Sequence, residues 1–316
     1  MSMAGIGIIT NPHSRRNRRY PEQMRRLGYI LGQNDSYEMT NRIEDVARVA
    51  EQFRDNEIDI LALNGGDGTN HVTLSTFIEV YGDTPLPRIT FLRGGTMNTI
   101  SNGIGIKGKP SRLLANLVEK YYTKQPFETT RRDMLKVTDV DDTRYGFIFG
   151  NGLVSNFLEA YYDTGNPTPT TAAVLLSKAL AGLPFGGQLA KEIVRPFTAH
   201  LEFGDGEAWP ERDYTSVLAA TIDQIGLGFT PFIRSEEQPG TFHVLALTAG
   251  PFEIARELPN IRLGRPIDPK RASSKVADRV TLSSDKPITY TIDGDMHTSD
   301  GPVTLETGPR VEIIVK

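Results

Sequence analysis

Twice in its first half, the chain repeats one local pattern: an apolar run, a pair of glycines, and polar residues that can begin a helix. The run Ile58 to Leu63 leads into Gly65-Gly66, and the run Ile89 to Leu92 leads into Gly94-Gly95. Strands that stop in tight glycine turns and continue as helices are typical of α/β domains. In an open α/β sheet, ligands bind beyond the carboxyl ends of the strands. We therefore expect the two glycine loops to share one pocket.

The chain is long enough for two domains. Its 316 residues exceed the ordinary size of a single core. Residues 1–130 are predicted to form the α/β domain, and residues 131–316 a second, mainly β domain. Two helical stretches, Thr171 to Leu183 and Phe252 to Leu258, interrupt the β-rich runs of the second part. The predicted fold class is an α/β nucleotide-binding domain followed by a mainly β domain.

Composition excludes several classes of function. A net charge of −4 and a pI near 5.8 give no broad positive field, so nucleic acid is not expected as a partner. The absence of cysteine excludes disulfides, thiolate metal sites and a cysteine nucleophile. No apolar run approaches the roughly 20 residues that span a bilayer, and residues 1–10 lack the features of a signal peptide. We expect a cytoplasmic protein whose contact with membranes is peripheral and transient.

The run Gly65-Gly66-Asp67-Gly68-Thr69 has the chemistry of a phosphate loop. Glycines allow backbone N–H groups to approach phosphate oxygens, and the N-terminus of the following helix favours an anion. Asp67 is suited to this place if Mg²⁺ or its waters stand between its carboxylate and the phosphates. A plain surface turn is the alternative, because each of these residues is common in turns.

Three further segments favour the phosphate loop. Asn11-Pro12-His13-Ser14-Arg15 follows the first predicted strand, Thr40 precedes a predicted helix, and Gly94 to Asn98 follows a later strand. All of them stand at strand ends or helix starts, where one nucleotide can be bound by several loops. Late in the chain, Asp293-Gly294-Asp295 between two β runs predicts a hairpin turn.

Taken in order, these segments resemble the diacylglycerol kinase catalytic-domain family, which also contains ceramide and sphingosine kinases and is distantly similar to NAD kinases. That family has an Asn-Pro-x-Ser-Gly loop, a threonine before a helix, Gly-Gly-Asp-Gly-Thr, Gly-Thr-x-Asn and a late Asp-Gly-Glu. This sequence has Asn11-Pro12-x-Ser14, Thr40, Gly65 to Thr69, Gly95-Thr96-x-Asn98 and Asp293-Gly294-Asp295 in the same order.

The resemblance implies an ATP-dependent lipid kinase with Mg²⁺ as the metal of Mg-ATP, near Asp67. Asp295 takes the place of the catalytic glutamate, as general base on the lipid hydroxyl, and Asp293 is a carboxylate that could share this task. No lipid-binding residue is identified. The implied ATP-binding residues are Asn11, Pro12, Ser14, Arg15, Thr40, Gly65, Gly66, Asp67, Gly68, Thr69, Asn70, Thr96 and Asn98.

Several positions depart from the family pattern. Arg15 replaces a glycine, Asn70 begins a segment without the usual acid, and the later Gly-x-Asp-Ala segment reads Gly152-Leu153-Val154-Ser155. Pro239 stands where an aspartate holds a structural Mg²⁺ in some bacterial members, so no such metal is expected here. Asp295 is one methylene shorter than glutamate, and small misplacements of a base slow a reaction strongly.

Three hypotheses remain open from the sequence. The first is a kinase of a membrane lipid such as diacylglycerol or ceramide, with a role in phospholipid metabolism. The second is a kinase of a soluble alcohol such as NAD, and the third is a nucleotide-binding regulator or degenerate kinase without turnover. A basic cluster near the nucleotide end suits anionic lipid, a solvated helix face or the ATP phosphates: Arg15, Arg16, Arg18, Arg19, Arg25 and Arg26.

Overall fold

The computed structural model describes residues 5–32 and 34–315, which form two compact units. The first unit runs to Arg132 and takes in the chain again from Arg310, and the second comprises Asp133–Pro309. The sequence pattern predicts that all of residues 131–316 belong to the second domain. The last residues instead belong to the first unit, because Ile313 pairs in parallel with Ile89 and the Thr90 hydroxyl donates to the carbonyl oxygen of Ile314 at 3.1 Å.

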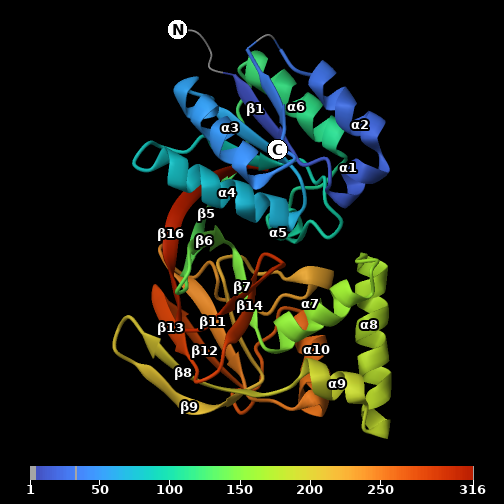
Figure 1. The fold of residues 1–316 in the computed structure, drawn as a ribbon, viewed down its shortest axis with the longest axis vertical. Helices are drawn as coiled ribbons and strands as arrows, with labels where there is room; N and C mark the ends of the chain where they lie inside the picture. The colour runs from blue at the N-terminus through green and yellow to red at the C-terminus, as the bar shows by residue number, and fades with distance from the viewer. Residues whose placement is uncertain (1–4, 33, 316) are drawn as a thin grey trace. The chain divides into compact units, whose positions relative to one another are not determined.

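A parallel sheet is the centre of the first unit (Figure 1). Its strand order is β2, β1, β3, β4, followed by the end of β16, and β1 pairs in parallel with both β2 and β3. The chain goes from β1 to β2 on one side and then to β3 on the other, so the strand order reverses at β1. The bounds are β1 Ile6–Thr10, β2 Ser36–Met39, β3 Ile60–Asn64, β4 Arg88–Phe91 and β16 Val303–Ile314.

Helices cover both faces of this sheet. On one face, Ile8 and Ala62 pack with Leu27 and with Leu114 and Leu117 of α6. On the other face, Phe53 of α3 lies against Gly7 and makes an edge contact with Phe77 of α4. The helices are α1 Arg15–Arg19, α2 Pro21–Arg25, the 3₁₀ helix η1 Arg26–Tyr29, α3 Ile43–Asp55, α4 Asp67–Tyr81, α5 Thr99–Gly103 and α6 Pro110–Tyr122.

The second unit is built from antiparallel strands. Six of them pair in the order β12, β11, β10, β7, β14, β15, and a second group pairs β16 with β13, β13 with β8, and β8 with β9. Tyr290 and Phe149 of the first group share one buried core with Leu201 and Leu282 of the second. The predicted α/β and mainly β parts are therefore confirmed. The strands are β5 Thr129–Thr138, β6 Thr143–Gly146, β7 Ile148–Asn151, β8 Phe197–Phe203, β9 Ala208–Tyr214, β10 Ser216–Ala220, β11 Phe242–Leu247, β12 Ala272–Ala277, β13 Arg279–Ser283, β14 Ile288–Ile292 and β15 Asp295–Ser299.

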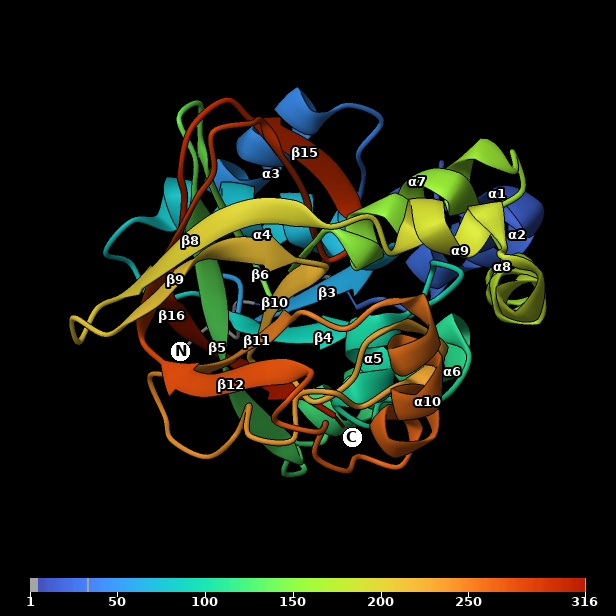
Figure 2. The ribbon, with the colours of Figure 1, turned by 90° about the horizontal axis from the view of Figure 1, so that it is seen from below.

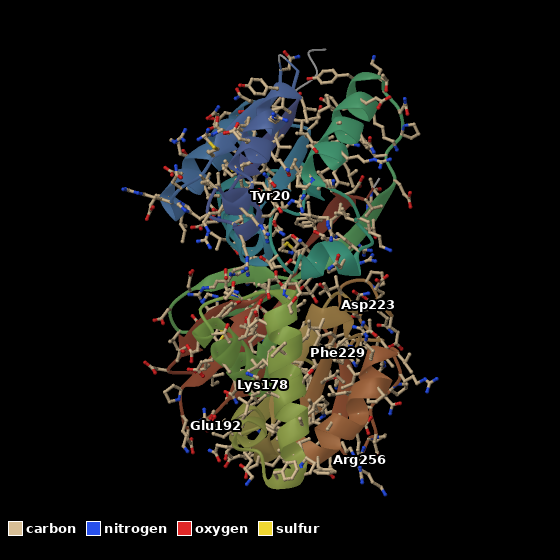
Figure 3. The ribbon with its side chains drawn as sticks, turned by 90° about the vertical axis from the view of Figure 1, so that its right-hand side faces the viewer. Tyr20, Lys178, Glu192, Asp223, Phe229 and Arg256 are labelled. Carbon is tan, nitrogen blue, oxygen red and sulfur yellow. The ribbon has the colours of Figure 1, made fainter. Side chains whose placement is uncertain are left out.

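Four helices accompany these strands, and Figures 1 and 2 both place α7 beside α9. Phe157 and Leu183 belong to a small apolar cluster with Ala179 and Ile193, so these residues pack as core. Lys178, the one charged residue of α8, lies on the side that Figure 3 shows. The bounds are α7 Leu153–Asp163, α8 Pro169–Gly182, α9 Gln188–Ile193 and α10 Pro251–Arg262, with the 3₁₀ helices η2 Leu183–Phe185 and η3 Gly226–Gly228. No helix of the described residues is both long enough and apolar enough to cross a membrane.

A buried histidine makes the stability of the second unit depend on pH. His243 is 1% exposed and its Nε2 lies 2.8 Å from the Ser274 hydroxyl oxygen. Desolvation, helped by the nearby charge of Arg234, lowers its pKa from 6.5 to about 4. Because the folded pKa lies below the unfolded one, the contribution to stability is complete above pH 6.5 and is lost as the pH falls toward 4.

We predict that acid destabilises the protein partly through this residue, by up to roughly 3 kcal/mol between those two pH values. His243→Leu, which cannot be protonated, should flatten the fall in the thermal midpoint between pH 7 and pH 4.5. Exposed His13 provides the matched control, and His13→Leu should follow the wild-type curve. Equal slopes for all three proteins would contradict the assignment.

Candidate functional site

The carboxyl ends of three neighbouring parallel strands carry the loops that the sequence singled out. β1 ends at Thr10 before Asn11, β3 ends at Asn64 before Gly65, and β4 leads through Leu92 to Gly94. The strand order reverses at β1, which is the position where open α/β sheets bind ligands. These loops lie at one edge of the sheet within the first unit, and a pocket shared by them stays a prediction.

The two glycine loops touch through their backbones. A Cβ atom added to Gly95 would lie 2.3 Å from the Cα of Gly66, and one added to Gly65 would lie 2.4 Å from the Cβ of Thr69. Distances this short leave no room for a side chain. Glycine at Gly65 and Gly95 is therefore required by the close approach of the chain segments.

Asp67 joins the same two loops by hydrogen bonds. Its carboxylate oxygens accept the backbone N–H groups of Thr99 at 2.9 Å and Ile100 at 3.3 Å, which open α5. Desolvation raises the pKa of Asp67, although these N–H groups and the nearby Arg93 charge act in the opposite direction. A carboxylate at a helix N-terminus is a stabilising cap. Asp67 thus fixes the second loop relative to the first.

The loop between β4 and α5 is also held from inside. Asn98 has a left-handed φ of 49°, and its side chain accepts from the N–H of Gly95 and donates to the Gly95 carbonyl, both at 3.2 Å. Arg93 donates to the Asn102 side chain at 2.7 Å and to the Ile106 carbonyl at 2.6 Å. The side chain of Asn98, an expected ATP contact, is therefore engaged in shaping its own loop.

The first loop meets the glycine loop at Thr69. The Asn11 amide donates to the Thr69 hydroxyl oxygen at 2.9 Å, and the Ser14 hydroxyl lies 3.2 Å from the same atom. The α4 helix that Thr69 helps to open has Gly66 at its N-cap and no side-chain cap. Its first-turn N–H groups can therefore bind an anion.

One residue at this edge was missed by the sequence analysis. Asn17 of α1 is 4% exposed, and its amide nitrogen donates to the carbonyl oxygens of Asn11 at 2.8 Å and Asn64 at 2.9 Å. A Cβ atom at Gly94 would lie 2.9 Å from that same nitrogen. Asn17 thus contacts all three loops. Its position among arginines gave no signal of this role, because the role depends on contacts between distant segments.

The other expected residues differ in their exposure. Thr40 is 7% exposed and follows β2, where its N–H donates to the Thr10 carbonyl at 3.1 Å. Asn70 is 3% exposed on the inner side of α4, which suits a support of the loop better than a contact surface. Pro12, Arg15 and Thr96 are half-buried at the loops. Gly66, Asp67, Gly68 and Thr69 are also half-buried.

The second unit carries the predicted hairpin turn. β14 and β15 are joined by Asp293 and Gly294, whose φ values of 52° and 98° are both in the left-handed region, and Ile292 pairs with Asp295. Asp-Gly in such a two-residue turn is the expected choice. Asp295 is half-buried at the start of β15. Its position relative to the glycine loops stays a prediction.

Asp293 and Asp295 have different surroundings. Asp293 is 6% exposed, and its carboxylate accepts the N–H groups of Phe147 at 3.0 Å and Ile148 at 2.9 Å. Tyr162 of α7 donates its hydroxyl to the Gly294 carbonyl at 2.8 Å, which fixes the turn from the other side. Asp293 therefore holds the hairpin in place, while Asp295 is the more accessible carboxylate.

Below the turn, a polar cluster supports the same hairpin. Arg144 donates to Asp139 at 3.0 Å and to the Tyr290 hydroxyl at 3.2 Å, and Tyr290 donates to Asp139 at 2.5 Å. Although desolvation opposes it, these donors and nearby backbone N–H groups lower the pKa of Asp139 to about 2. His297 lies in β15 and its ring packs against that of Tyr290, with the ring centroids 5.4 Å apart.

Possible metal ligands were sought among the described residues. No group of three or more histidine or acidic side chains there is arranged to hold a metal ion. Asp67 uses its oxygens for the α5 backbone. Near Pro239, the N–H of Gly240 donates to Asp133 at 2.8 Å and its carbonyl accepts from Thr307 at 2.8 Å. Direct protein contacts thus close this loop.

Comparison with known proteins finds one family model that matches part of the chain. Residues 6–126 match the family model described as "Diacylglycerol kinase catalytic domain". No curated protein sequence matches the chain. A solved structure from Bacillus anthracis described as a diacylglycerol kinase has 13% identity and a TM-score of 0.66, with 100% of this chain and 98% of that chain covered. Two more from the same organism, described as candidates for that activity, have 13% and 15% identity and TM-scores of 0.69 at the same coverage. At this identity, the likeness concerns the fold.

The contact between the glycine loops leads to a prediction on ligand binding. Gly95→Ala places a methyl group 2.3 Å from the Gly66 Cα and should force the loops apart, so we expect the Kd for a non-hydrolysable ATP analogue to rise at least tenfold by calorimetry. Gly28→Ala is the matched control, because a Cβ there would meet only Tyr37 at 3.8 Å. A Gly95→Ala protein that folds and binds like the wild type would show that the contact is not needed.

Proposed function

We propose, from the match of residues 6–126 to the diacylglycerol kinase catalytic domain model, that the chain transfers the γ-phosphate of ATP to the hydroxyl of a membrane lipid. The single observation that supports it most is the convergence of the two glycine loops at the carboxyl ends of β3 and β4, held by Asp67. Diacylglycerol is the first candidate acceptor, and ceramide the second.

The proposed nucleotide site uses the first unit alone. Backbone N–H groups of Gly65 to Thr69, at the uncapped start of α4, bind the phosphate oxygens. Asn11 and Ser14 orient Thr69 from one side. Arg15, which replaces the glycine of the family pattern, adds a guanidinium to the phosphate site. Asp67, Asn98 and Thr40 act on the nucleotide indirectly, through the position of the loops.

The proposed reaction assigns the proton transfer to Asp295. Its carboxylate accepts the proton of the lipid hydroxyl, and the hydroxyl oxygen forms a bond to the γ-phosphorus. The bond from that phosphorus to its bridging oxygen breaks, and ADP leaves. Phosphoryl transfer depends mainly on positioning and on stabilising the charge of the phosphate oxygens, so the loops are expected to contribute more than the base.

Magnesium enters this proposal with the nucleotide. Mg²⁺ commonly keeps several waters and binds through substrate phosphates and one or two carboxylates. Asp67 is engaged with α5, and we assign the metal to the phosphates of the nucleotide. The protein's share of the chemistry is therefore assigned to its own backbone and side chains.

Two hypotheses compete with the lipid kinase. A regulator that binds nucleotide without turnover is motivated by the shorter base at Asp295 and by the missing acids after Thr69. A kinase of a soluble alcohol such as NAD has no observation in its favour beyond the shared superfamily. A phosphate-transfer assay distinguishes both alternatives from the lipid kinase, because neither of them transfers phosphate to a lipid.

The test is transfer of labelled γ-phosphate to a panel of lipids in mixed micelles, with ATP binding measured separately. We expect transfer to diacylglycerol or ceramide, a loss of at least about 100-fold in kcat for Asp295→Asn with unchanged ATP affinity, and substantial activity for Asp295→Glu. Asp300→Asn, at an exposed residue of the next turn, should behave as wild type.

One outcome would contradict the kinase assignment, and another would contradict the role of Asp295. Intact ATP binding without transfer to any lipid would favour the regulator. Transfer that survives Asp295→Asn unchanged would remove Asp295 as the base while leaving the kinase assignment in place.

A further inference from the structure

The second unit contains a cavity of about 640 Å³ that the proposed phosphotransfer does not use. It lies between the N-terminal end of α7, the start of β8 and the turn from β13 to β14. Thr289 of β14 lines it, whereas Asp295 pairs with Ile292, three residues further along the same strand. At about 3.3 Å per residue, these two positions of β14 are about 10 Å apart. An acceptor hydroxyl must lie within about 3 Å of its base, so the cavity is not where the proton is removed.

The lining of the cavity is polar and charged, which does not suit an acyl chain. Arg195 and Lys286 contribute cations, Glu211 and Asp285 contribute carboxylates, and Ser283 is among several hydroxyl residues. None of these four charged residues forms an ion pair within residues 5–32 and 34–315. A polar ligand with both an anionic and a hydrogen-bond-donating end would complement this lining.

The side-chain amide of Asn151 is part of the cavity lining. Asn151 is 2% exposed, and its side-chain oxygen accepts the N–H of Val217 at 2.7 Å. The described residues provide no hydrogen-bond acceptor for its amino group, and the residue lines the cavity. A side-chain amino group that faces a cavity without a protein partner can donate to a water or to a ligand. Asn151 therefore marks a place for an acceptor atom.

The N-terminus of α7 opens onto the same cavity. This helix has 11 residues, Gly152 at its N-cap, no side-chain cap and no acidic residue in its first turn. Gly152, Ser155 and Asn156 all line the cavity. Where the related family pattern has an acid in this segment, the chain has Val154. The Leu153 N–H donates to the Thr215 carbonyl at 2.8 Å, and the remaining N–H groups of the first turn favour a phosphate or carboxylate group.

The walls of the cavity are fixed before any ligand arrives. Ser284 donates to the Thr198 carbonyl at 2.8 Å, which attaches the turn after β13 to β8. Asn156 donates to the Ile193 carbonyl at 3.1 Å, which attaches α7 to α9. A preformed site loses less free energy on binding than one that must be ordered first.

We propose that this cavity binds a small phosphate monoester whose other end carries hydroxyl or amine groups. The phosphate is recognised by the start of α7, the Asn151 amino group, Arg195 and Lys286. The donor groups at the other end are recognised by Glu211 and Asp285. The site is distinct from the nucleotide loops, and the proposal goes beyond the kinase activity, so either assignment can fail without the other.

The test is binding by calorimetry, with a non-hydrolysable ATP analogue at saturation so that the nucleotide loops are occupied. The probes are sn-glycerol 3-phosphate, phosphoethanolamine, inorganic phosphate and glycerol. We expect one binding site for each ester, with inorganic phosphate at least tenfold weaker and glycerol without measurable binding.

Variants locate the site. Arg195→Gln with Lys286→Gln changes two exposed side chains and should weaken both esters at least tenfold. Lys191→Gln with Lys270→Gln removes the same charge from exposed residues outside the cavity and should leave binding unchanged. Asn151→Asp keeps the acceptor for Val217 and puts a negative oxygen in place of the amino group, so it should also weaken binding.

The proposal is overturned if neither ester binds, or if binding is unaffected by Arg195→Gln with Lys286→Gln. Inorganic phosphate binding as tightly as the esters would overturn the assigned roles of Glu211 and Asp285.

Discussion

The close contact between Gly66 and Gly95 is the constraint on which the candidate site depends. It exists because neither residue has a side chain. It brings the loop after β4 within hydrogen-bonding reach of Asp67, which follows the loop after β3. Asp67 then holds the start of α5, and Asn17 ties the loop after β1 to the same place. Phosphate recognition by backbone N–H groups requires such rigid placement, because the groups cannot move independently to meet a ligand.

In the second unit, a comparable arrangement fixes the hairpin that carries Asp295. Asp293 binds the backbone of β7 and the residue before it, and Tyr162 binds the turn from α7. These contacts assign a structural task to Asp293, the first carboxylate of the Asp-Gly-Asp run. The family match covers residues 6–126, so the role of Asp295 depends on the resemblance of its motif and on the proposed reaction.

Local sequence patterns predicted the features that local chemistry determines. The glycine loops, the strands that lead into them and the Asp-Gly turn follow from residue preferences over a few positions, and the structure contains all three. Contacts between distant segments were not predictable in this way. Asn17, the capping of α5 by Asp67, the return of β16 to the first unit and the cavity beside α7 each depend on residues far apart in the chain.

The central claim is that the backbone around Gly65 to Thr69 and Gly94 to Asn98 binds the phosphates of a nucleotide. Hydrogen–deuterium exchange with and without ATP tests it most directly, because it reports on those N–H groups themselves. The account predicts slower exchange on ATP addition in peptides that cover both loops, and no change in peptides from α10. Unchanged exchange in both loops at a saturating ATP concentration would contradict it.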